Sequence, residues 1–241
     1  MRLYYDLHIH SALSACADDD MTPNNITNMA MLKELDVIAV TDHNTVGNLR
    51  VIDRLAKERG ILLLPGMELE TMEEIHTLCY FPTVDAAEEF EAGIAPFRTA
   101  QKNRVDIFGH QYRMDEEDEI VEEVETLLSM AVGLPLEKAL AMVKTLSGVA
   151  VPAHVDKPAY SIFSSLGYIP PEYGFTALEL SSRPAAVDFA REKIPEGKYL
   201  ILRNSDAHYL GDMMEKLHFL PDCEKSTKNI INFFQNFIRN V

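Results

Sequence analysis

Short apolar runs recur along this chain, and each run ends in polar or turn-forming residues. Several runs are apolar at consecutive positions rather than at every second one, which is typical of strands covered on both faces in a parallel sheet. This feature constrains the fold most, because such a sheet needs other elements, usually helices, on its two faces. The runs span residues 36–41, 61–67, 76–81, 148–154, 176–181 and 199–204.

Helical patterns lie between many of these runs. Thr22 and Pro23 predict an N-cap followed by proline at the first helical position, and Gly60 ends a helix that begins near Val46. Further helices are predicted over 135–146, 184–193 and 225–239. The alternation of strands and helices predicts an α/β fold, for which a closed or nearly closed barrel is one solution.

The segment 85–130 is the least regular part of the chain. It contains an acidic run over 115–119, which lacks the glycine-punctuated spacing of an EF-hand loop. An apolar stripe at helical spacing predicts that this run lies on the solvated face of an amphipathic helix. The stripe consists of Ile120, Val121, Val124, Leu127 and Leu128. We find no internal repeat or linker and therefore expect one domain over 1–241, with 85–130 as an irregular, partly helical, insertion-like segment.

The charge balance constrains the partners. There are 22 basic and 38 acidic residues, and the net charge is −16. Such a field repels polyanions, because non-specific nucleic-acid binding relies on Lys and Arg to neutralise phosphates. We therefore expect no long nucleic acid as a partner. A small anionic substrate could still bind if metal ions reversed the charge locally.

The cysteines and the apolar segments constrain the cellular setting. Cys16, Cys79 and Cys223 are scattered and odd in number, which argues against a disulfide framework and against a Cys-rich zinc site. No apolar run is long enough to span a bilayer, and the chain begins without a signal-peptide pattern. These features predict a cytoplasmic protein without a membrane partner.

Histidines gather at the ends of the predicted strands. In the first strand, Asp6, His8 and His10 share one face, and two imidazoles with a carboxylate suit a transition metal. The carboxyl ends of parallel barrel strands meet at one rim, so the polar residues at these ends predict a multinuclear metal site. They are His8, His10, His43, His76, His154 and His208, with Glu68 and Asp206 beside them. We expect His110 and His218 to lie outside this site.

The same residues carry a family resemblance. The motifs at 6–11, 41–44 and 205–208, together with Glu68, His76 and His154, resemble the PHP family, named for polymerase and histidinol phosphatase. The resemblance covers nearly the whole chain and implies a distorted (β/α)7 TIM-like barrel. It also implies two or three divalent Zn, Mn or Fe ions at the C-terminal rim of the strands.

Carried over residue by residue, the resemblance implies nine metal ligands. They are His8, His10, Asp18, His43, Glu68, His76, His154, Asp206 and His208. The choice of Asp18 is open, because the segment 14–20 holds an insertion relative to the family pattern. Asp18 lies five residues before Pro23, as the family's SDG aspartate lies before its proline. Asp19, Asp20 and Cys16 are the alternatives.

This site predicts a metal-dependent phosphoesterase that hydrolyses a small phosphorylated molecule by means of a metal-bridging hydroxide. Glu68 could bridge two ions, and ions about 3.5–4 Å apart can stabilise both oxygens of an in-line displacement at phosphorus. The catalytic candidates are Asp206, Arg183 and Lys157, of which the last two would hold the phosphate. Asp6 and Asp42 are candidates for orienting imidazoles.

Several alternatives stay open at this point. The substrate could be a nucleotide, a sugar phosphate or a molecule like histidinol phosphate, and a monoester or a diester. A 3′–5′ exonuclease of the PHP type could use the same ions, although we see no basic or aromatic path for a strand. A non-catalytic, metal-stabilised regulatory or binding module is the third reading, and an amide-bond hydrolase is a more distant one. The oligomeric state is not determined by the sequence.

Overall fold

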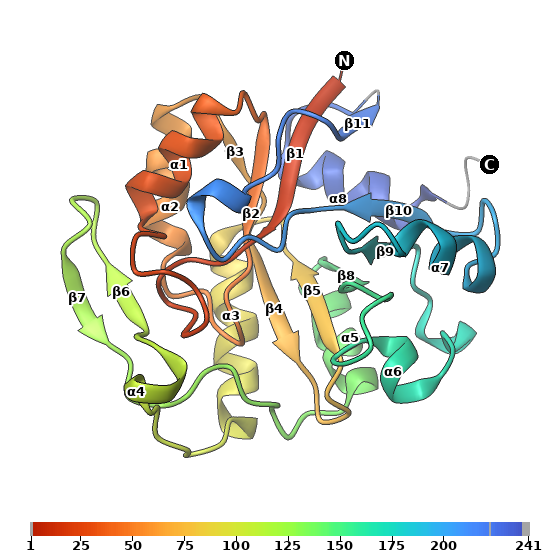
Figure 1. The fold of residues 1–241 in the computed structure, drawn as a ribbon, viewed down its shortest axis with the longest axis horizontal. Helices are drawn as coiled ribbons and strands as arrows, with labels where there is room; N and C mark the ends of the chain where they lie inside the picture. The colour runs from red at the N-terminus through yellow and green to blue at the C-terminus, as the bar shows by residue number, and fades with distance from the viewer. Residues whose placement is uncertain (1, 222, 238–241) are drawn as a thin grey trace.

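A computed structural model describes residues 2–221 and 223–237, and strands alternate with helices along much of the chain (Figure 1). The strands are β1 (Arg2–Ile9), β2 (Val37–Val40), β3 (Leu62–Leu63), β4 (Gly66–Glu70), β5 (His76–Tyr80), β6 (Tyr112–Met114), β7 (Ile120–Glu123), β8 (Val149–Pro152), β9 (Ala177–Leu180), β10 (Leu200–Arg203) and β11 (Phe219–Pro221). The α-helices are α1 (Pro23–Leu32), α2 (Leu49–Glu58), α3 (Val84–Ile94), α4 (Val105–Phe108), α5 (Leu136–Thr145), α6 (Ile162–Leu166), α7 (Ala186–Lys193) and α8 (Thr227–Gln235). Short 3-10 turns lie at Ala95–Phe97, Pro171–Tyr173 and Leu210–Asp212. The predicted α/β class is confirmed.

Most predicted elements lie where the periodicity placed them. Thr22 accepts a hydrogen bond from the Asn25 N–H and so caps α1. The run 61–67 is divided into β3 and β4, because Pro65 has no N–H to continue the ladder. The last two residues of the helix predicted over 225–239 lie outside the described residues. None of the described helices is long and apolar enough to cross a membrane.

The strands form four sheets, ordered β11-β1-β2-β3, β10-β9, β4-β5-β8 and β6-β7. The pairs β1–β2, β2–β3 and β9–β10 are parallel, whereas β5 runs antiparallel to both β4 and β8. None of the sheets in the described part of the chain closes into a barrel, so the predicted distorted (β/α)7 TIM-like barrel is not confirmed. The strands are short, and backbone pairing between neighbouring sheets is reduced to isolated bridges, such as Ile9 with Ala207, and single hydrogen bonds.

Strand β2 shows why consecutive positions are apolar. Val37 and Ala39 belong to a buried cluster that includes residues of β1, β5, β8 and α8. Ile38 and Val40 point the other way, into a cluster with residues of α1, α2 and α3. Both faces of the strand are therefore buried, as the uninterrupted apolar run predicts.

The amphipathic helix predicted around 115–128 is wrong. Residues 112–123 form the hairpin β6–β7 at one edge of the molecule instead (Figure 1). Val121 is 61% exposed whereas Leu127 and Leu128 are buried, so the apolar residues do not form one buried face. The carboxylate of Asp115 accepts hydrogen bonds from the N–H groups of Glu117 and Glu119, and this local turn reverses the chain where a helix would have continued. Within 85–130 the α-helices are α3 and α4.

Candidate metal centre

Eight of the nine predicted ligand residues converge on one region. Strand β1 carries His8 and His10, and Glu68 lies in β4. His43 follows β2, His154 follows β8, and Asp206 and His208 follow β10. His76 is the first residue of β5, so it reaches the same rim because β5 runs antiparallel to its neighbours. Convergence at strand ends therefore includes one strand that arrives from the opposite direction.

The carboxylate of Glu68 lies at the centre of this cluster, and Glu68 is only 1% exposed. Its two oxygens lie 2.9–3.4 Å from nitrogens of five imidazoles. A carboxylate has about four lone-pair sites, so it cannot accept a full hydrogen bond from each ring. The five rings belong to His8, His10, His43, His76 and His154.

Glu179 orients one of these imidazoles and escaped the sequence prediction. This carboxylate of β9 is 1% exposed and lies 3.0 Å from His8 Nδ1. It also accepts hydrogen bonds from the His154 N–H and from Asn204. A carboxylate acceptor requires a proton on His8 Nδ1, so in the neutral ring, the form that can bind an ion, the Nε2 lone pair faces the cluster. The available signal was a lone acidic residue within the apolar run 177–180.

A second relay fixes the ring of His10. Its Nδ1 lies 3.0 Å from the Ser14 hydroxyl, which donates its own proton to Asp42 at 2.6 Å. The hydroxyl therefore accepts from Nδ1–H, and His10 Nε2 keeps its lone pair. Asp42 orients an imidazole through Ser14 rather than directly. Asp6 accepts a hydrogen bond from Ser205 and makes none to an imidazole among the described residues.

The oriented atoms fit a divalent ion. His8 Nε2 and His10 Nε2 lie 3.2 Å apart and 3.3–3.4 Å from oxygens of Glu68 and Asp206. A tetrahedral ion with nitrogen and oxygen ligands at about 2.0–2.1 Å separates its ligand atoms by roughly 3.3–3.4 Å. Lone pairs at this spacing repel one another unless a cation or additional protons lie between them. The clustered donors indicate divalent metals as cofactors.

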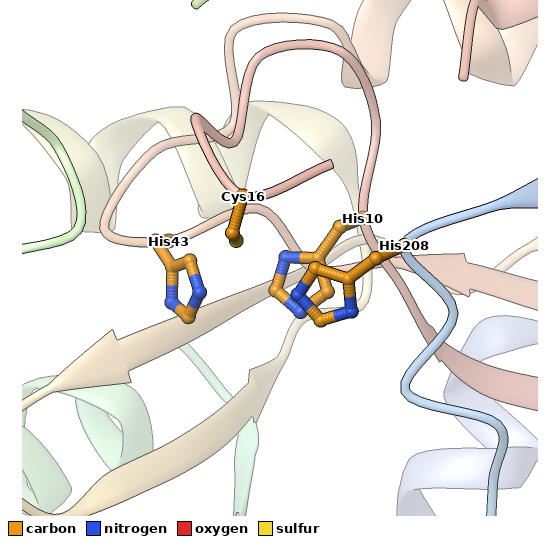
Figure 2. Close-up of side chains that lie close together, drawn as sticks. All are labelled: His10, Cys16, His43 and His208. Carbon is orange, nitrogen blue, oxygen red and sulfur yellow. The ribbon is translucent and has the colours of Figure 1, made fainter. Parts of the chain in front are cut away.

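Two further groups of donor atoms adjoin this one. The first contains His43, Glu68 and His76, and the second contains His10, Cys16, His43 and His208 (Figure 2). Within each group the donor atoms lie within 4.8 Å of one another. Glu68, His10 and His43 each belong to two of the groups. The donors are therefore sufficient for more than one ion.

Burial sets the protonation of the outer imidazoles. It lowers the pKa of His43 well below its usual range. Burial and neighbouring His10 together lower the pKa of His208 to about 4. Both rings are therefore neutral near pH 7 and keep a lone pair for a ligand. Burial would raise the pKa of Glu68, but His76, His8 and His43 hold it well below its usual range.

The thiol of Cys16, unlike these two imidazoles, must lose a proton before it can bind an ion. The residue as a whole is exposed, but desolvation of its thiol, reinforced by the negative charge of Glu68, raises the pKa of Cys16 to about 12. The thiol is therefore protonated near neutral pH and is a poor nucleophile unless a cation stabilises its thiolate.

The predicted phosphate-binding residues are placed differently from each other. Lys157 is 34% exposed at its side chain, and its Nζ lies 2.5 Å from an Asp206 oxygen. Burial opposes its charge, but Asp206 raises the pKa of Lys157, so this residue stays cationic. Arg183 is exposed, and its guanidinium forms no hydrogen bond or ion pair with any residue described here.

Asp18 lies outside the three donor groups. Its carboxylate accepts a hydrogen bond from the Asp20 N–H at 2.9 Å, which is a local turn contact. Asp19 and Asp20 are exposed. As expected, the groups do not include His110, which pairs with Glu123, or His218.

Comparisons with known proteins give partial relatives. No family model matches the chain. A 5′-3′ exoribonuclease of Haemophilus influenzae is 36% identical over 67 residues, which are 28% of this chain and 23% of the relative. A 3′,5′-nucleoside bisphosphate phosphatase of Chromobacterium violaceum is 32% identical over 101 residues, which are 41% of this chain and 34% of the relative. The chain therefore spans about a quarter to a third of these two curated relatives.

Solved structures match over nearly the whole chain. The lesion-specific endonuclease Q of Pyrococcus furiosus superimposes with a TM-score of 0.70 at 21% identity, covering 98% of this chain and 56% of that one. A provisionally assigned metal-dependent phosphoesterase of Bifidobacterium adolescentis gives a TM-score of 0.62 at 19% identity and covers 91% and 93%. At this level of identity these matches establish the fold.

One prediction about partners is wrong. The net charge led us to expect no long nucleic acid, but endonuclease Q has been solved with a 27-mer duplex substrate whose abasic lesion lies at the active site. Net charge describes the whole molecule, whereas ions held at a site set the local field. Acidity alone therefore does not exclude such a substrate for this fold. The chain shares the fold of endonuclease Q and of the phosphoesterase named above, and its motifs resemble those of the PHP family.

Proposed function

We propose that this chain is a metal-dependent phosphoester hydrolase. The observation that carries the proposal is the buried Glu68 carboxylate surrounded by five imidazoles, two of which direct lone pairs at it. A closed structural site normally uses about four ligands, so this larger set argues against a purely structural role. Both sequence relatives named above are enzymes that hydrolyse phosphoesters, which is the reaction class predicted for this chain.

Two overlapping ligand sets follow from the distances. His8, His10, Asp206 and Glu68 would hold one ion, and His76, His154 and Glu68 would hold a second, which leaves His43 and His208 for a further ion. Divalent ions at these positions would lower the pKa of water towards 7 and offset negative charge on the reacting phosphoryl group. Zn, Mn and Fe are the candidates.

The protein side chains have separate tasks in this proposal. Lys157 offers a point charge to a phosphate oxygen at the edge of the site. Asp206 is held ionised, because His8 and His10 lower its pKa despite its burial, so it binds cations rather than donating a proton. Arg183 would contact phosphate only by turning its exposed side chain towards the rim.

For the substrate we propose a small phosphorylated molecule of the nucleotide kind. In its support, Lys157 is the one predicted phosphate-binding residue that touches a described site residue, and a relative acts on a nucleoside bisphosphate. A nuclease is the second candidate. The match to endonuclease Q over 98% of the chain and the exoribonuclease relative favour it.

We also propose that the separate sheets are arranged as a distorted (β/α)7 barrel, and two kinds of contact between the sheets support this. Apolar residues of β1, β2, β5, β8, β9 and β10 share one buried cluster, as inward-facing barrel residues would. A bridge from His43 to Glu68 joins β2 to β4, and the Val155 N–H donates to the Glu179 carbonyl between β8 and β9.

The test is a phosphoester panel with defined metal content. Protein stripped with a chelator is reloaded with Zn, Mn or Fe and offered nucleoside monophosphates, a nucleoside 3′,5′-bisphosphate, an oligoribonucleotide and an abasic duplex. We expect metal-dependent hydrolysis that Glu68→Gln abolishes, while Glu58→Gln, on the exposed face of α2, retains it.

The order of rates separates the readings. Faster turnover of the small nucleotides supports the leading proposal, and faster cleavage of the oligonucleotide or duplex supports the nuclease. If fully loaded protein hydrolyses nothing in the panel, the enzymatic proposal is wrong and a metal-stabilised binding module becomes the better description.

A further inference from the structure

We propose that Cys16 supplies a sulfur ligand to one of the ions of this site, in the position where the sequence predicts Asp18. The inference deepens the proposed function and rests on it, because it assigns a ligand to the same metal centre. It changes the chemistry of that centre, since one donor becomes a soft thiolate instead of a carboxylate.

The first support is the position of the thiol. Cys16 Sγ and one nitrogen each of His10, His43 and His208 lie within 4.8 Å of one another. Figure 2 shows the Cys16 side chain directed towards these three imidazoles rather than away from them. His10 already uses Nε2 for the ion beside His8 and Nδ1 for Ser14, so His43, His208 and the sulfur remain as donors for this ion. Nitrogen and sulfur donors of this kind bind zinc.

The second support comes from the imidazoles. His43 Nδ1 is buried without a hydrogen-bond partner, and so is the Glu68 Oε2 atom 3.1 Å away. Buried polar atoms without partners are costly and call for an explanation such as an ion. His208 Nδ1 lies 2.8 Å from the Asp206 carbonyl oxygen, so it carries the proton and leaves Nε2 with a lone pair.

The third support is the conformation of the loop. Asp18 N–H donates to the His208 carbonyl oxygen at 2.9 Å, which fixes this loop beside the ligand segment. On the opposite side Gly109, with φ +98°, packs so closely that a Cβ would lie 2.3 Å from the Ala15 carbonyl oxygen. This packing holds the backbone at Ala15, next to Cys16, whereas the Asp18 carboxylate accepts a hydrogen bond from the Asp20 N–H.

Other uses of this cysteine fit less well. A nucleophilic role requires a thiolate in the absence of a cation, which burial and the charge of Glu68 oppose. A disulfide has no partner among the described cysteines, because Cys79 and Cys223 are buried and all three are free. A thiolate ligand would favour Zn or Fe over Mn at this position.

X-ray absorption at the zinc edge of the zinc-loaded full chain tests the inference without measuring activity. We expect a sulfur shell at about 2.3 Å beside nitrogen and oxygen at about 2.0–2.1 Å. Cys16→Ser removes the sulfur shell and weakens binding of one ion at least tenfold. The matched control Cys223→Ala removes a thiol that lies outside the donor groups and retains the shell. Asp18→Asn also retains the shell and the zinc content.

The outcomes are decisive in both directions. Fully zinc-loaded wild type without a sulfur shell overturns the inference, and so does loss of an ion from Asp18→Asn but not from Cys16→Ser. If Cys16→Ser fails to fold, the wild-type spectrum alone decides. Zinc binding and hydrolysis without sulfur would overturn this ligand assignment only, whereas failure to bind Zn, Mn and Fe alike would also overturn the proposed function.

Discussion

Glu179→Gln is the substitution that best tests how the site is organised. The Glu179 carboxylate is not itself a candidate metal ligand. Its side-chain contact with one candidate ligand, His8, fixes the tautomer of that imidazole. Both of its oxygens accept from N–H donors, from His8 and Asn204 on one side and from His8 and His154 on the other. The amide of glutamine must place its NH2 against one of these donors, so at least one hydrogen bond is lost.

The expected size follows from these contacts. A hydrogen bond to a charged group contributes roughly 1.5–3 kcal/mol, and residues that orient a metal ligand typically change metal affinity about 10–100-fold. We therefore expect Glu179→Gln to weaken metal binding about 10–100-fold, which corresponds to roughly 1.4–2.8 kcal/mol. Folding is retained, because the side-chain volume is unchanged.

Competition with a chelator measures this affinity, and circular dichroism checks the fold. Asp36→Asn is the matched control, since it removes a carboxylate that accepts from the Tyr4 N–H before β2 begins, away from the donor groups. Metal affinity within twofold of wild type in a folded Glu179→Gln variant would refute the reasoning. An equal loss of affinity in Asp36→Asn would refute it as well.

Three further predictions follow from the same contacts. Ser14→Ala breaks the relay from His10 to Asp42 and should lower metal affinity about tenfold, measured by chelator competition; unchanged affinity would contradict the relay. Lys157→Met should raise the KM for a phosphorylated substrate about tenfold or more while leaving metal content unchanged, and a loss of metal would instead assign it to the ligand shell. Despite burial, Glu68 raises the pKa of His76 to about 9 in metal-free protein, so protonation stabilises the fold below pH 6.5 and this contribution is lost as the pH rises through about 9. Thermal unfolding should therefore show metal-free protein losing stability over this range while zinc-loaded protein does not, and parallel profiles would contradict the assignment.

The sequence predicted much of this fold because burial periodicity is a local property. The fully apolar run around β2 is buried on both faces, and Thr22 caps α1 as its position indicated. The stripe from Ile120 to Leu128 misled us for a related reason. Helical spacing of apolar residues is compatible with several conformations, and the turn contacts of Asp115 selected a hairpin.

The candidate site likewise contains residues that the sequence predicted and residues that it did not. Residues at strand ends were predictable, because the direction of a strand determines where its last side chains lie. Glu179 was not, since its role depends on the ring of His8 across a sheet boundary, and Asp42 reaches His10 only through Ser14. These are contacts between segments far apart in the chain, which no spacing encodes.

The sequence by itself determined an α/β chain with a cluster of histidines and carboxylates, because strand and helix periods and residue chemistry are written locally. Only the tertiary structure decided that β5 runs antiparallel to β4 and so brings His76 to the site. It also decided that the loop after β1 places Cys16 rather than Asp18 beside the imidazoles. Strand direction and loop conformation depend on the free energy of packing against distant segments, here β4, β8 and Gly109. That free energy is a property of the assembled fold.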